Sequence, residues 1–482
     1  MATAVEGRRI VILGLARQGT ALARWLIEQG ARVTASDVQP ADTLRVRHAI
    51  ESLADLSIHY ELGGHPLALL DGCDMLCLSG GVPIEAPIVV EARRRGIALS
   101  NDAQLFLERC PAAVIGITGS AGKTTTTALV GAMGRSAGRK TWVGGNIGNP
   151  LIGELAGMTA WDLVAMELSS FQLELMTASP PVAAVLNVTP NHLDRHGTMA
   201  AYVAAKARIL DYQSAPDMAV LGYDDPVARS LIGRAKGRLT LFGRNGVDDW
   251  GYLAHTRVEN GRVVLARSRS PERSEGAGEG EQLRASVPRE ASVSCCKVSD
   301  IRLRGDHNVL NVLAACALAD AAGIAPQAMR DAIGAFAGVE HRLQFVRERH
   351  GVQYYDDSIA TAPERVIAAL HSFQEPIVLL AGGRDKHLPW DEAAQLIVKR
   401  VRQLILFGEM AGLVQRSIAD VTWCDSLESV HQVETLAEAV QKAADVARPG
   451  DVVLLSPGGT SFDAFKDFAE RGDKFQECVR AL

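Results

Sequence analysis

The stretch ITGSAGKTTTTALV (residues 117–130) decides the fold, because an apolar strand here runs through a glycine-rich turn into a helix. Glycines in such a turn let backbone N–H groups converge on phosphate oxygens, and the helix N-terminus adds positive potential. Lys123 can neutralise the β- and γ-phosphates, and Thr124 can offer its hydroxyl to Mg²⁺. The stretch therefore predicts a site for a nucleoside triphosphate and magnesium.

The glycine spacing departs from the general phosphate-loop pattern. GxxxxGK would need glycine at position 117, where this chain has Ile117, and the glycines stand instead at 116, 119 and 122. The strand, turn and helix around the loop argue against a chance Gly-Lys-Thr. The shifted glycines instead indicate a particular subfamily of phosphate loop.

Composition limits the classes of protein to consider. A chain of 482 residues suggests about three domains of roughly 150 residues each. The formal net charge of −6 gives no basic stripe, which argues against a nucleic-acid partner. No apolar run reaches the ~20 residues of a membrane span, and the N-terminus lacks a signal-peptide pattern. The eight cysteines form no CxxC pair, which fits a reducing compartment. We therefore expect a cytoplasmic protein without a membrane segment, and separately we expect a monomer.

The chain predicts three α/β segments. Residues 1–101 have the strand–helix–strand order of an α/β unit, and residues 102–338 alternate strands and helices around the phosphate turn, as a mainly parallel sheet would. Residues 339–482 form a third α/β series, whose strands end at Gly or Pro. Residues 266–292, rich in Ser, Glu, Arg and Gly, predict a disordered or loosely packed surface insertion.

Polar residues follow two later strands of the central segment. Glu167 closes the strand DLVAME and suits a carboxylate ligand of Mg²⁺. His192, Asp194 and His196 come just after another apolar strand, where α/β sheets place ligands. A lone histidine there is more often structural, but beside a phosphate site it is a candidate metal or substrate contact. By composition alone, Lys206 is an ordinary surface lysine.

The first segment carries half of a dinucleotide-binding pattern. GLARQG (residues 14–19), followed by Asp37, has Gly14 and Gly19 but lacks the opening GxG. The pattern is weak, and it allows either a nucleotide contact or a bare structural turn.

Eight motifs, in this order, resemble the Mur ligase family. They are TGSAGKTT (118–125), GGNIG (144–148), ELSSFQLE (167–174), NHLDRH (191–196), AAKARI (204–209), HNVLN (307–311), EHRLQ (340–344) and SPGGTSFDAFKDF (456–468). The ELSSFQLE form resembles the glutamate-adding branch of that family. The resemblance covers nearly the whole chain apart from residues 266–292.

The resemblance implies a fold and a reaction. The fold has a Rossmann-like UDP-binding domain, a central ATPase domain and a Rossmann-like C-terminal domain that brings the amino acid. In the implied reaction, ATP phosphorylates the carboxylate of UDP-N-acetylmuramoyl-L-alanine, and the amine of glutamate, expected to be D-glutamate, attacks the acyl phosphate. The products are an amide, ADP and phosphate. A carboxylate needs such activation, because its oxygen is otherwise a poor leaving group.

The resemblance also assigns residues to each substrate. It implies that ATP is held by Gly119, Ser120, Ala121, Gly122, Lys123, Thr124, Thr125, Thr126, Asn308, Asn311, Arg342 and Asp357. It implies one Mg²⁺ at Thr124 and Glu167 and a second at His192 and Lys206, with Lys206 carbamylated by CO₂. The implied catalytic set is Lys123, Glu167, His192 and Lys206. The UDP substrate would contact Gly14, Leu15, Ala16, Asp37, Ser79, Gly80, Gly81, Asn146 and His192.

Glutamate would be selected in the third domain, where the chain departs from the family at one position. The implied contacts are Thr361, Lys386, Ser461 and Phe468. Many family members have DSKAT where this chain has DDSIAT, so Ile359 stands at the lysine position. The change removes a cation that could help to place a glutamate carboxylate or a phosphate. The choice between D- and L-glutamate therefore stays open at this point.

Three other functions fit part of the pattern. A folylpolyglutamate synthase-like ligase would share the phosphate loop but usually begins close to it, whereas about one hundred residues precede Ile117 here. An ATPase switch would turn over ATP without glutamate and would leave the third domain's motifs unused. A nicotinamide oxidoreductase would need the glycine that GLARQG lacks.

Overall fold

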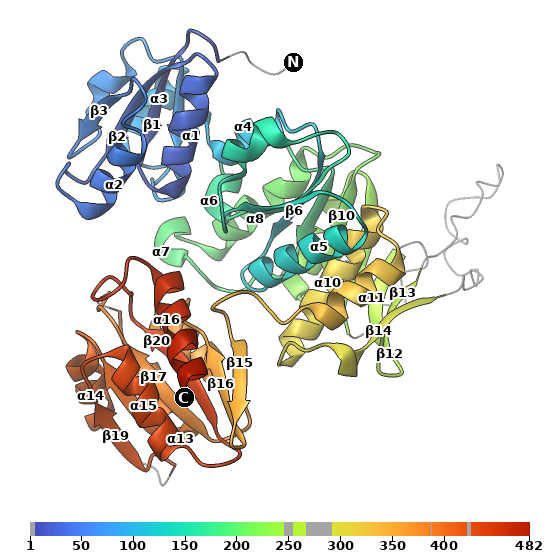
Figure 1. Ribbon diagram of the computed structural model, residues 1–482. Coiled ribbons are helices and arrows are strands. Elements are labelled where there is room, and N and C mark those ends of the chain that lie inside the picture. The colour runs from blue at the N-terminus through green and yellow to red at the C-terminus, as the bar shows by residue number, and fades with distance from the viewer. Residues whose placement is uncertain (1–4, 245–253, 267–291, 387, 422–425) are drawn as a thin grey trace. The chain divides into compact units, whose positions relative to one another are not determined.

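Three sheets, each made mainly of parallel strands, organise the chain (Figure 1). This computed structural model describes residues 5–244, 254–266, 292–386, 388–421 and 426–482. Residues 1–301 and 307–335 form one compact unit, and residues 302–306 and 336–482 form a second. Residues 267–291 of the predicted insertion lie outside the described residues. No helix of the described segments is long and apolar enough to cross a membrane.

The first sheet is parallel throughout its described strands, in the order β3-β2-β1-β4-β5. The strands are β1 (Arg9–Leu13), β2 (Arg32–Asp37), β3 (His59–Leu62), β4 (Met75–Leu78) and β5 (Ala98–Ser100). Helices α1 (Arg17–Glu28), α2 (Leu44–Ser52) and α3 (Pro87–Arg94) connect them, and α4 (Asp102–Leu107) follows. The strand order reverses beside β1, and sheets of this kind bind ligands at that place.

The central sheet has the described strand order β14-β13-β12-β11-β10-β9-β6-β8-β7. Its strands are β6 (Ala113–Thr118), β7 (Thr141–Gly145), β8 (Leu163–Glu167), β9 (Val182–Val185), β10 (Met218–Gly222), β11 (Arg238–Phe242), β12 (Ala254–Glu259), β13 (Arg262–Ala266) and β14 (Val293–Lys297). Strands β6 to β12 pair in parallel, whereas β13 runs antiparallel to both β12 and β14. The last three strands therefore add an antiparallel edge that the alternating pattern did not predict.

Helices flank the central sheet in the first unit (Figure 1). They are α5 (Lys123–Ser136), α6 (Ser170–Leu173), α7 (Leu193–His196), α8 (Met199–Asp211), α9 (Pro226–Ser230), α10 (Asp306–Ala321) and α11 (Pro326–Ala335). Strand β8 is buried along its whole length, as expected of a parallel strand covered on both faces. Strand β6 lies between β8 and β9, so the phosphate turn that follows it meets the ends of both neighbours.

The third sheet has the described order β15-β16-β20-β17-β18-β19, with only β15 antiparallel to its neighbour. Its strands are β15 (Gln344–Arg349), β16 (Val352–Asp356), β17 (Ile377–Gly382), β18 (Val401–Phe407), β19 (Ser429–Gln432) and β20 (Val452–Gly458). Its helices are α12 (Pro363–Leu370), α13 (Asp391–Arg400), α14 (Ala411–Ala419), α15 (Leu436–Val446) and α16 (Phe468–Ala481).

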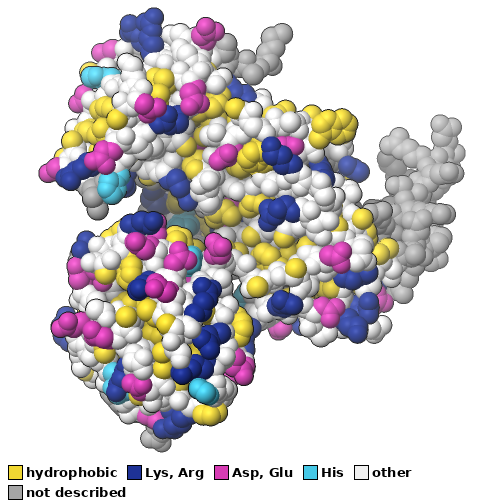
Figure 2. All heavy atoms as spheres, viewed as in Figure 1, with side chains coloured by type: hydrophobic (Ala, Val, Ile, Leu, Met, Phe, Trp, Pro, Cys, Tyr) yellow, Lys and Arg dark blue, Asp and Glu magenta, His cyan; other side chains and the backbone are white. Residues whose placement is uncertain are grey.

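These sheets confirm the predicted three-domain α/β class and the mainly parallel central sheet. The domain bounds 1–101, 102–338 and 339–482 stay a prediction. Figure 2 shows acidic and basic side chains spread over the surface of each unit on the face that it presents.

Helix α16 packs so closely on β16 that one of its positions accepts only glycine. A Cβ atom added at Gly472 would lie 2.1 Å from Nδ1 of His341 and 2.8 Å from Oδ2 of Asp356. Both of these side chains are buried and hydrogen-bonded to each other, so neither can move away cheaply. The glycine therefore allows the helix to approach the strand.

We expect Gly472→Ala to destabilise the second unit by about 1–3 kcal/mol, because the clash outweighs alanine's better helix propensity. Gly412→Ala in α14 is the matched control, since its added Cβ would meet only Nη1 of Arg416, at 3.5 Å. Differential scanning calorimetry of both variants checks this. Equal unfolding midpoints for the two variants would contradict the close packing.

Candidate active site

The phosphate turn joins β6 to α5 through a glycine in left-handed conformation. Gly122 has φ of 82°, which residues with a Cβ rarely adopt. A Cβ added there would lie only 2.2 Å from Oδ1 of Asn311 in α10. The backbone of the turn is therefore not covered by a side chain at position 122, as a phosphate-binding turn requires, and Asn311 lies directly against it.

The first residues of α5 offer polar groups to that cradle. Nζ of Lys123 donates to the carbonyls of Gly119 and Ser120, at 2.9 and 3.2 Å. By helix geometry, the N–H groups of the first three residues of α5 have no acceptor within the helix. The N–H of Thr126 already donates to the carbonyl of Gly122, and Thr126 is fully buried. The backbone N–H groups at the start of α5, up to Thr125, are thus better placed to bind a phosphate than that of Thr126.

Glu167 connects the helix to the neighbouring strands. Its Oε2 accepts a hydrogen bond from Oγ1 of Thr124, and its Oε1 accepts one from Nδ2 of Asn146, both at 2.9 Å. The carboxylate is 2% exposed. A hydroxyl and a carboxylate beside a phosphate cradle are the hard oxygen donors that Mg²⁺ prefers. These residues therefore fit a magnesium–nucleotide site.

The described residues hold no group of three or more His, Cys, Asp or Glu side chains placed to bind a metal. Magnesium in nucleotide sites needs no such group, because substrate phosphates and water supply most of its ligands.

Two residues that sequence reasoning missed hold the phosphate turn from outside. Asn187 brackets Ala121, accepting from its N–H at 2.9 Å and donating to its carbonyl at 3.1 Å. The hydroxyl of Tyr202 lies 3.0 Å from Oγ of Ser120. Asn187 lies shortly before the motif NHLDRH, and Tyr202 lies shortly before AAKARI. A polar side chain near each motif was the feature of the sequence that could have indicated them.

Lys206 is not the surface lysine that its composition suggests. It is 1% exposed, and its Nζ donates to the carbonyl of Gly119 at 2.8 Å. This Nζ also lies 4.6 Å from the centre of the Tyr202 ring. Burial, reinforced by the positive charge of Lys123, lowers the pKa of Lys206 to about 6. The structure thus brings a largely neutral amine against the phosphate turn at neutral pH.

His192 directly precedes the short helix α7 and is exposed. Its ring meets the edge of the Phe171 ring, with the centroids 5.3 Å apart. The ring of His196, at the other end of α7, stacks on the same phenyl ring. The side chain of Asp194 lies outside what the structure describes.

The residues expected to hold UDP meet at the ends of β1, β2 and β4. Leu15 donates its N–H to Oδ2 of Asp37 at 2.7 Å, and Oγ of Ser79 donates to the carbonyl of Gly14 at 2.8 Å. Arg45, which sequence reasoning missed, donates to Oδ1 of Asp37 at 2.9 Å. Ala16, Gly80 and Gly81 adjoin these residues on the same loops, whereas the expected contacts Asn146 and His192 follow β7 and precede α7 in the central part of the chain.

Burial would raise the pKa of Asp37, but the hydrogen bonds from Arg45, Gln39 and Leu15 outweigh it and lower that pKa. The carboxylate therefore stays charged at neutral pH and keeps the first loop in place.

Asn308 lies in the same helix as Asn311, which donates from Nδ2 to its Oδ1 at 2.9 Å. Both side chains are largely buried. Of these two residues expected to hold ATP, Asn311 thus lies against the phosphate turn, and Asn308 is hydrogen-bonded to Asn311.

Arg342 and Asp357 lie near each other within the second unit. Asp357 accepts from the N–H of Leu343 at 3.2 Å and from Oγ of Ser456 at 3.0 Å. Burial raises the pKa of Asp357 to about 7, although these hydrogen bonds and the charge of Arg342 act in the opposite direction.

The expected glutamate contacts come from loops after neighbouring strands of the third sheet. Nζ of Lys386, after β17, donates to Oγ1 of Thr361, after β16, at 3.1 Å. Ser461 follows β20 and is buried. Phe468 begins α16, and its carbonyl accepts from Oγ of Ser358 at 2.7 Å. The carboxyl ends of these parallel strands are where such sheets bind ligands.

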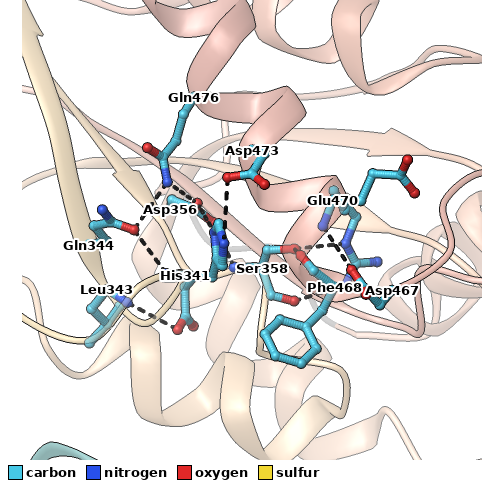
Figure 3. Close-up of polar contacts among 12 residues, drawn as sticks. His341, Leu343, Gln344, Asp356, Ser358, Asp467, Phe468, Glu470, Asp473 and Gln476 are labelled. Carbon is cyan, nitrogen blue, oxygen red and sulfur yellow. Dashed lines mark hydrogen bonds and ion pairs between the residues drawn. The ribbon is translucent and has the colours of Figure 1, made fainter. Parts of the chain in front are cut away.

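A buried polar cluster is hydrogen-bonded to the loop after β16 (Figure 3). His341 turns toward Asp356, with Nδ1 and Oδ2 2.8 Å apart, and Gln476 donates to the same oxygen at 2.9 Å. Burial opposes protonation of His341, but the hydrogen bond and charge of Asp356 raise its pKa overall. The carbonyl of His341 accepts from the N–H of Ile359 at 3.1 Å. The cluster thus holds the segment in which the family's lysine is missing.

Comparisons with known proteins agree with this arrangement. Three family models match: the Mur ligase MurD-like N-terminal domain over residues 8–101, the Mur ligase middle domain over 117–319, and the glutamate ligase domain of Mur ligases over 341–459. The UDP-N-acetylmuramoylalanine–D-glutamate ligase of Symbiobacterium thermophilum is 42% identical over 474 residues, covering 98% of each chain. The ligase of the same name from Acetivibrio thermocellus is 38% identical over 482 residues, covering 99% of this chain and 97% of its own.

Solved structures match the fold. UDP-N-acetylmuramate-alanine ligase MurC from Thermotoga maritima gives a TM-score of 0.56 at 19% identity, covering 98% of this chain and 99% of its own. MurF from Acinetobacter baumannii gives 0.55 at 17% identity, covering 97% and 93%.

We expect Gly122→Ala to weaken nucleotide binding at least tenfold, because its Cβ would strain the backbone and clash with Asn311. Gly138→Ala is the matched control, since Gly138 also has positive φ, +74°, but no atom within 4 Å of an added Cβ. Titration with a fluorescent ATP analogue measures both. Equal affinities in the two variants would contradict a nucleotide cradle at this turn.

Proposed function

The chain belongs to the Mur ligase family, and from this premise we propose that it joins D-glutamate to UDP-N-acetylmuramoyl-L-alanine in peptidoglycan precursor synthesis. The observation that carries this function most directly is the match, along 98% of the chain, to a relative named for this reaction. The enzyme is an ATP-dependent acid–amino-acid ligase. The name of these relatives favours D- over L-glutamate, despite Ile359.

The phosphate turn and the start of α5 would hold ATP. The backbone from Gly119 to Thr125 would bind the phosphates, and Lys123 would neutralise the phosphoryl group in transfer. Asn308 and Asn311 would contact the adenine end, and Arg342 and Asp357 are further proposed contacts of ATP. The open backbone at Gly122 and the proximity of Asn311 support this assignment.

Mg²⁺ would neutralise phosphate charge during transfer. Thr124 and Glu167 would hold one ion, and their mutual hydrogen bond at 2.9 Å supports a shared site. His192 and Lys206 would hold a second. Lys206 suits that role as a carbamate, formed when its neutral amine adds CO₂ and releases a proton. The lowered pKa of Lys206 supports this step, because only the neutral amine reacts.

The remaining residues would place the two reacting substrates. Asn146 and His192 would contact the muramoyl substrate, and the loops around Asp37 and Ser79 would hold UDP. Thr361, Lys386, Ser461 and Phe468 would orient glutamate so that its amine faces the activated carboxyl carbon. Catalysis of this kind consists mainly of positioning and charge neutralisation.

The enzyme would act in the cytoplasm, where ATP and reducing conditions occur together. The free thiols of the seven cysteines in the described residues agree with a reducing compartment. The monomeric state stays a prediction.

We expect the purified protein to release phosphate only when ATP, Mg²⁺, UDP-N-acetylmuramoyl-L-alanine and D-glutamate are all present. A malachite-green assay with each component omitted in turn checks this, and L-glutamate in a parallel reaction tests the choice of stereoisomer. Equal release without glutamate would contradict the ligase function. Equal rates with L-glutamate would contradict the proposed selectivity.

We expect Lys206→Ala to lower kcat at least a hundredfold, and short carboxylates such as formate or acetate to restore part of it by replacing the carbamate. Lys140→Ala is the matched control, because Lys140 is an exposed lysine of the same unit. Initial rates with and without added carboxylate measure the effect. Full activity of Lys206→Ala would reject the carbamate role.

A further inference from the structure

Helix α7 is too short to be stable without an anchor. It spans only Leu193–His196, and isolated helices of this length do not form in water. Its first flanking residue, His192, has φ of 53°, a left-handed conformation uncommon for residues other than glycine. Such a backbone persists only where the surroundings hold it. The position of His192 therefore depends on what holds α7.

The side chain of His196 is the buried part of α7. It is 1% exposed, whereas His192 and Leu193 are exposed. Its Nε2 lies 2.9 Å from Oγ of Ser170, and its Nδ1 lies 2.9 Å from Oε1 of Glu174. The contact of Nε2 with Ser170 and the short distance from Nδ1 to Glu174 orient the imidazole toward α6, although Nδ1 itself makes no hydrogen bond.

Aromatic contacts extend from His196 to His192. The ring of Phe171 stacks on that of His196, with centroids 5.2 Å apart and planes at 5°. The same phenyl ring meets His192 at 5.3 Å and 64°. Tyr202 covers another side of His196 at 5.0 Å. Phe171 therefore lies against both histidines, and its place depends on the orientation of His196.

The backbone gives a second connection. The N–H of His196 donates to the carbonyl of His192 at 3.0 Å, closing the single turn of α7. Displacement of the His196 ring would thus move His192 through the main chain as well as through Phe171.

Burial favours the neutral forms of both Glu174 and His196. Burial, with a contribution from Glu85, raises the pKa of Glu174 to about 7. Burial and the positive charges around it lower the pKa of His196. The two groups therefore need not both be charged at neutral pH, which limits the cost of burying them.

We propose that His196 is a positioning residue for His192, and that Ser170 and Glu174 hold His196 in the orientation this requires. The inference rests on the proposed contact of His192 with the muramoyl substrate and the second Mg²⁺. Ser170 begins α6 just after Glu167 ends β8, so the same contacts tie α7 to the strand end that carries the proposed magnesium ligand.

The test uses His196→Phe in the full-length enzyme, which keeps an aromatic ring against Phe171 but loses both polar contacts. We expect KM for UDP-N-acetylmuramoyl-L-alanine, and the Mg²⁺ concentration for half-maximal rate, to rise about tenfold or more. KM for glutamate should change less than twofold. A residue that only fills the core would leave this pattern absent, since phenylalanine fills the same space.

Two milder variants guard against misfolding of His196→Phe. Ser170→Ala and Glu174→Gln each remove one of the polar neighbours, and each should shift the same two parameters in the same direction by a smaller factor. His371→Phe is the matched control, because His371 is an exposed histidine outside the proposed site, and its kinetics should equal those of the wild type.

A double-mutant cycle with His192→Ala decides the route of action. If His196 acts through His192, adding His196→Phe to His192→Ala should change KM less than twofold. If the factors by which the two single variants raise KM multiply in the double variant, the inference is overturned. If the wild type is active and His196→Phe has the same kinetics, the role of His196 is overturned and the proposed function stands. If the wild type releases no phosphate in response to glutamate, the proposed function is overturned as well.

Discussion

The buried carboxylate of Glu167 is the contact on which the rest of the site depends. A charged group that is 2% exposed is costly unless hydrogen bonds satisfy it, and here Thr124 and Asn146 each bind one of its oxygens. Thr124 belongs to α5, Asn146 follows β7, and Glu167 ends β8. The carboxylate therefore connects the ends of β7 and β8 to α5, the helix that begins at the phosphate turn.

A second constraint is the crowding of positive charge at the same turn. Lys123 and Lys206 both donate to the carbonyl of Gly119, at 2.9 and 2.8 Å. Two ammonium groups on one acceptor repel each other, and burial disfavours the charge of the more enclosed one. The pKa of Lys206 is lowered for both reasons, with burial the larger. A lysine in this position loses its charge easily, and that loss relieves the repulsion.

The loops expected to bind glutamate differ from the phosphate turn, because they all follow strands of one sheet in the second unit. Arg471 is fully buried, and it donates to the hydroxyl and carbonyl of Ser358 and to the carbonyl of Gly459. It thereby joins the loop that carries Ile359 and Thr361 to the loop that carries Ser461. Together with the His341–Asp356 pair, it fixes the loop backbone regardless of the side chain at position 359. The loss of the family's lysine there is thus compatible with an intact loop.

Local patterns in the sequence determined the α/β class, the phosphate turn and the loops at the strand ends, because hydrophobic periodicity and glycine placement are properties of neighbouring residues. Only the tertiary structure decided which distant side chains meet. Lys206 reads as a surface lysine until α8 packs over the turn 87 residues before it, and Tyr202 reaches Ser120 in the same way. The antiparallel edge of β13 and β14, and the anchoring of α7 by His196, were likewise invisible. Burial and pKa depend on what folds against a residue, and no window along the chain contains that information.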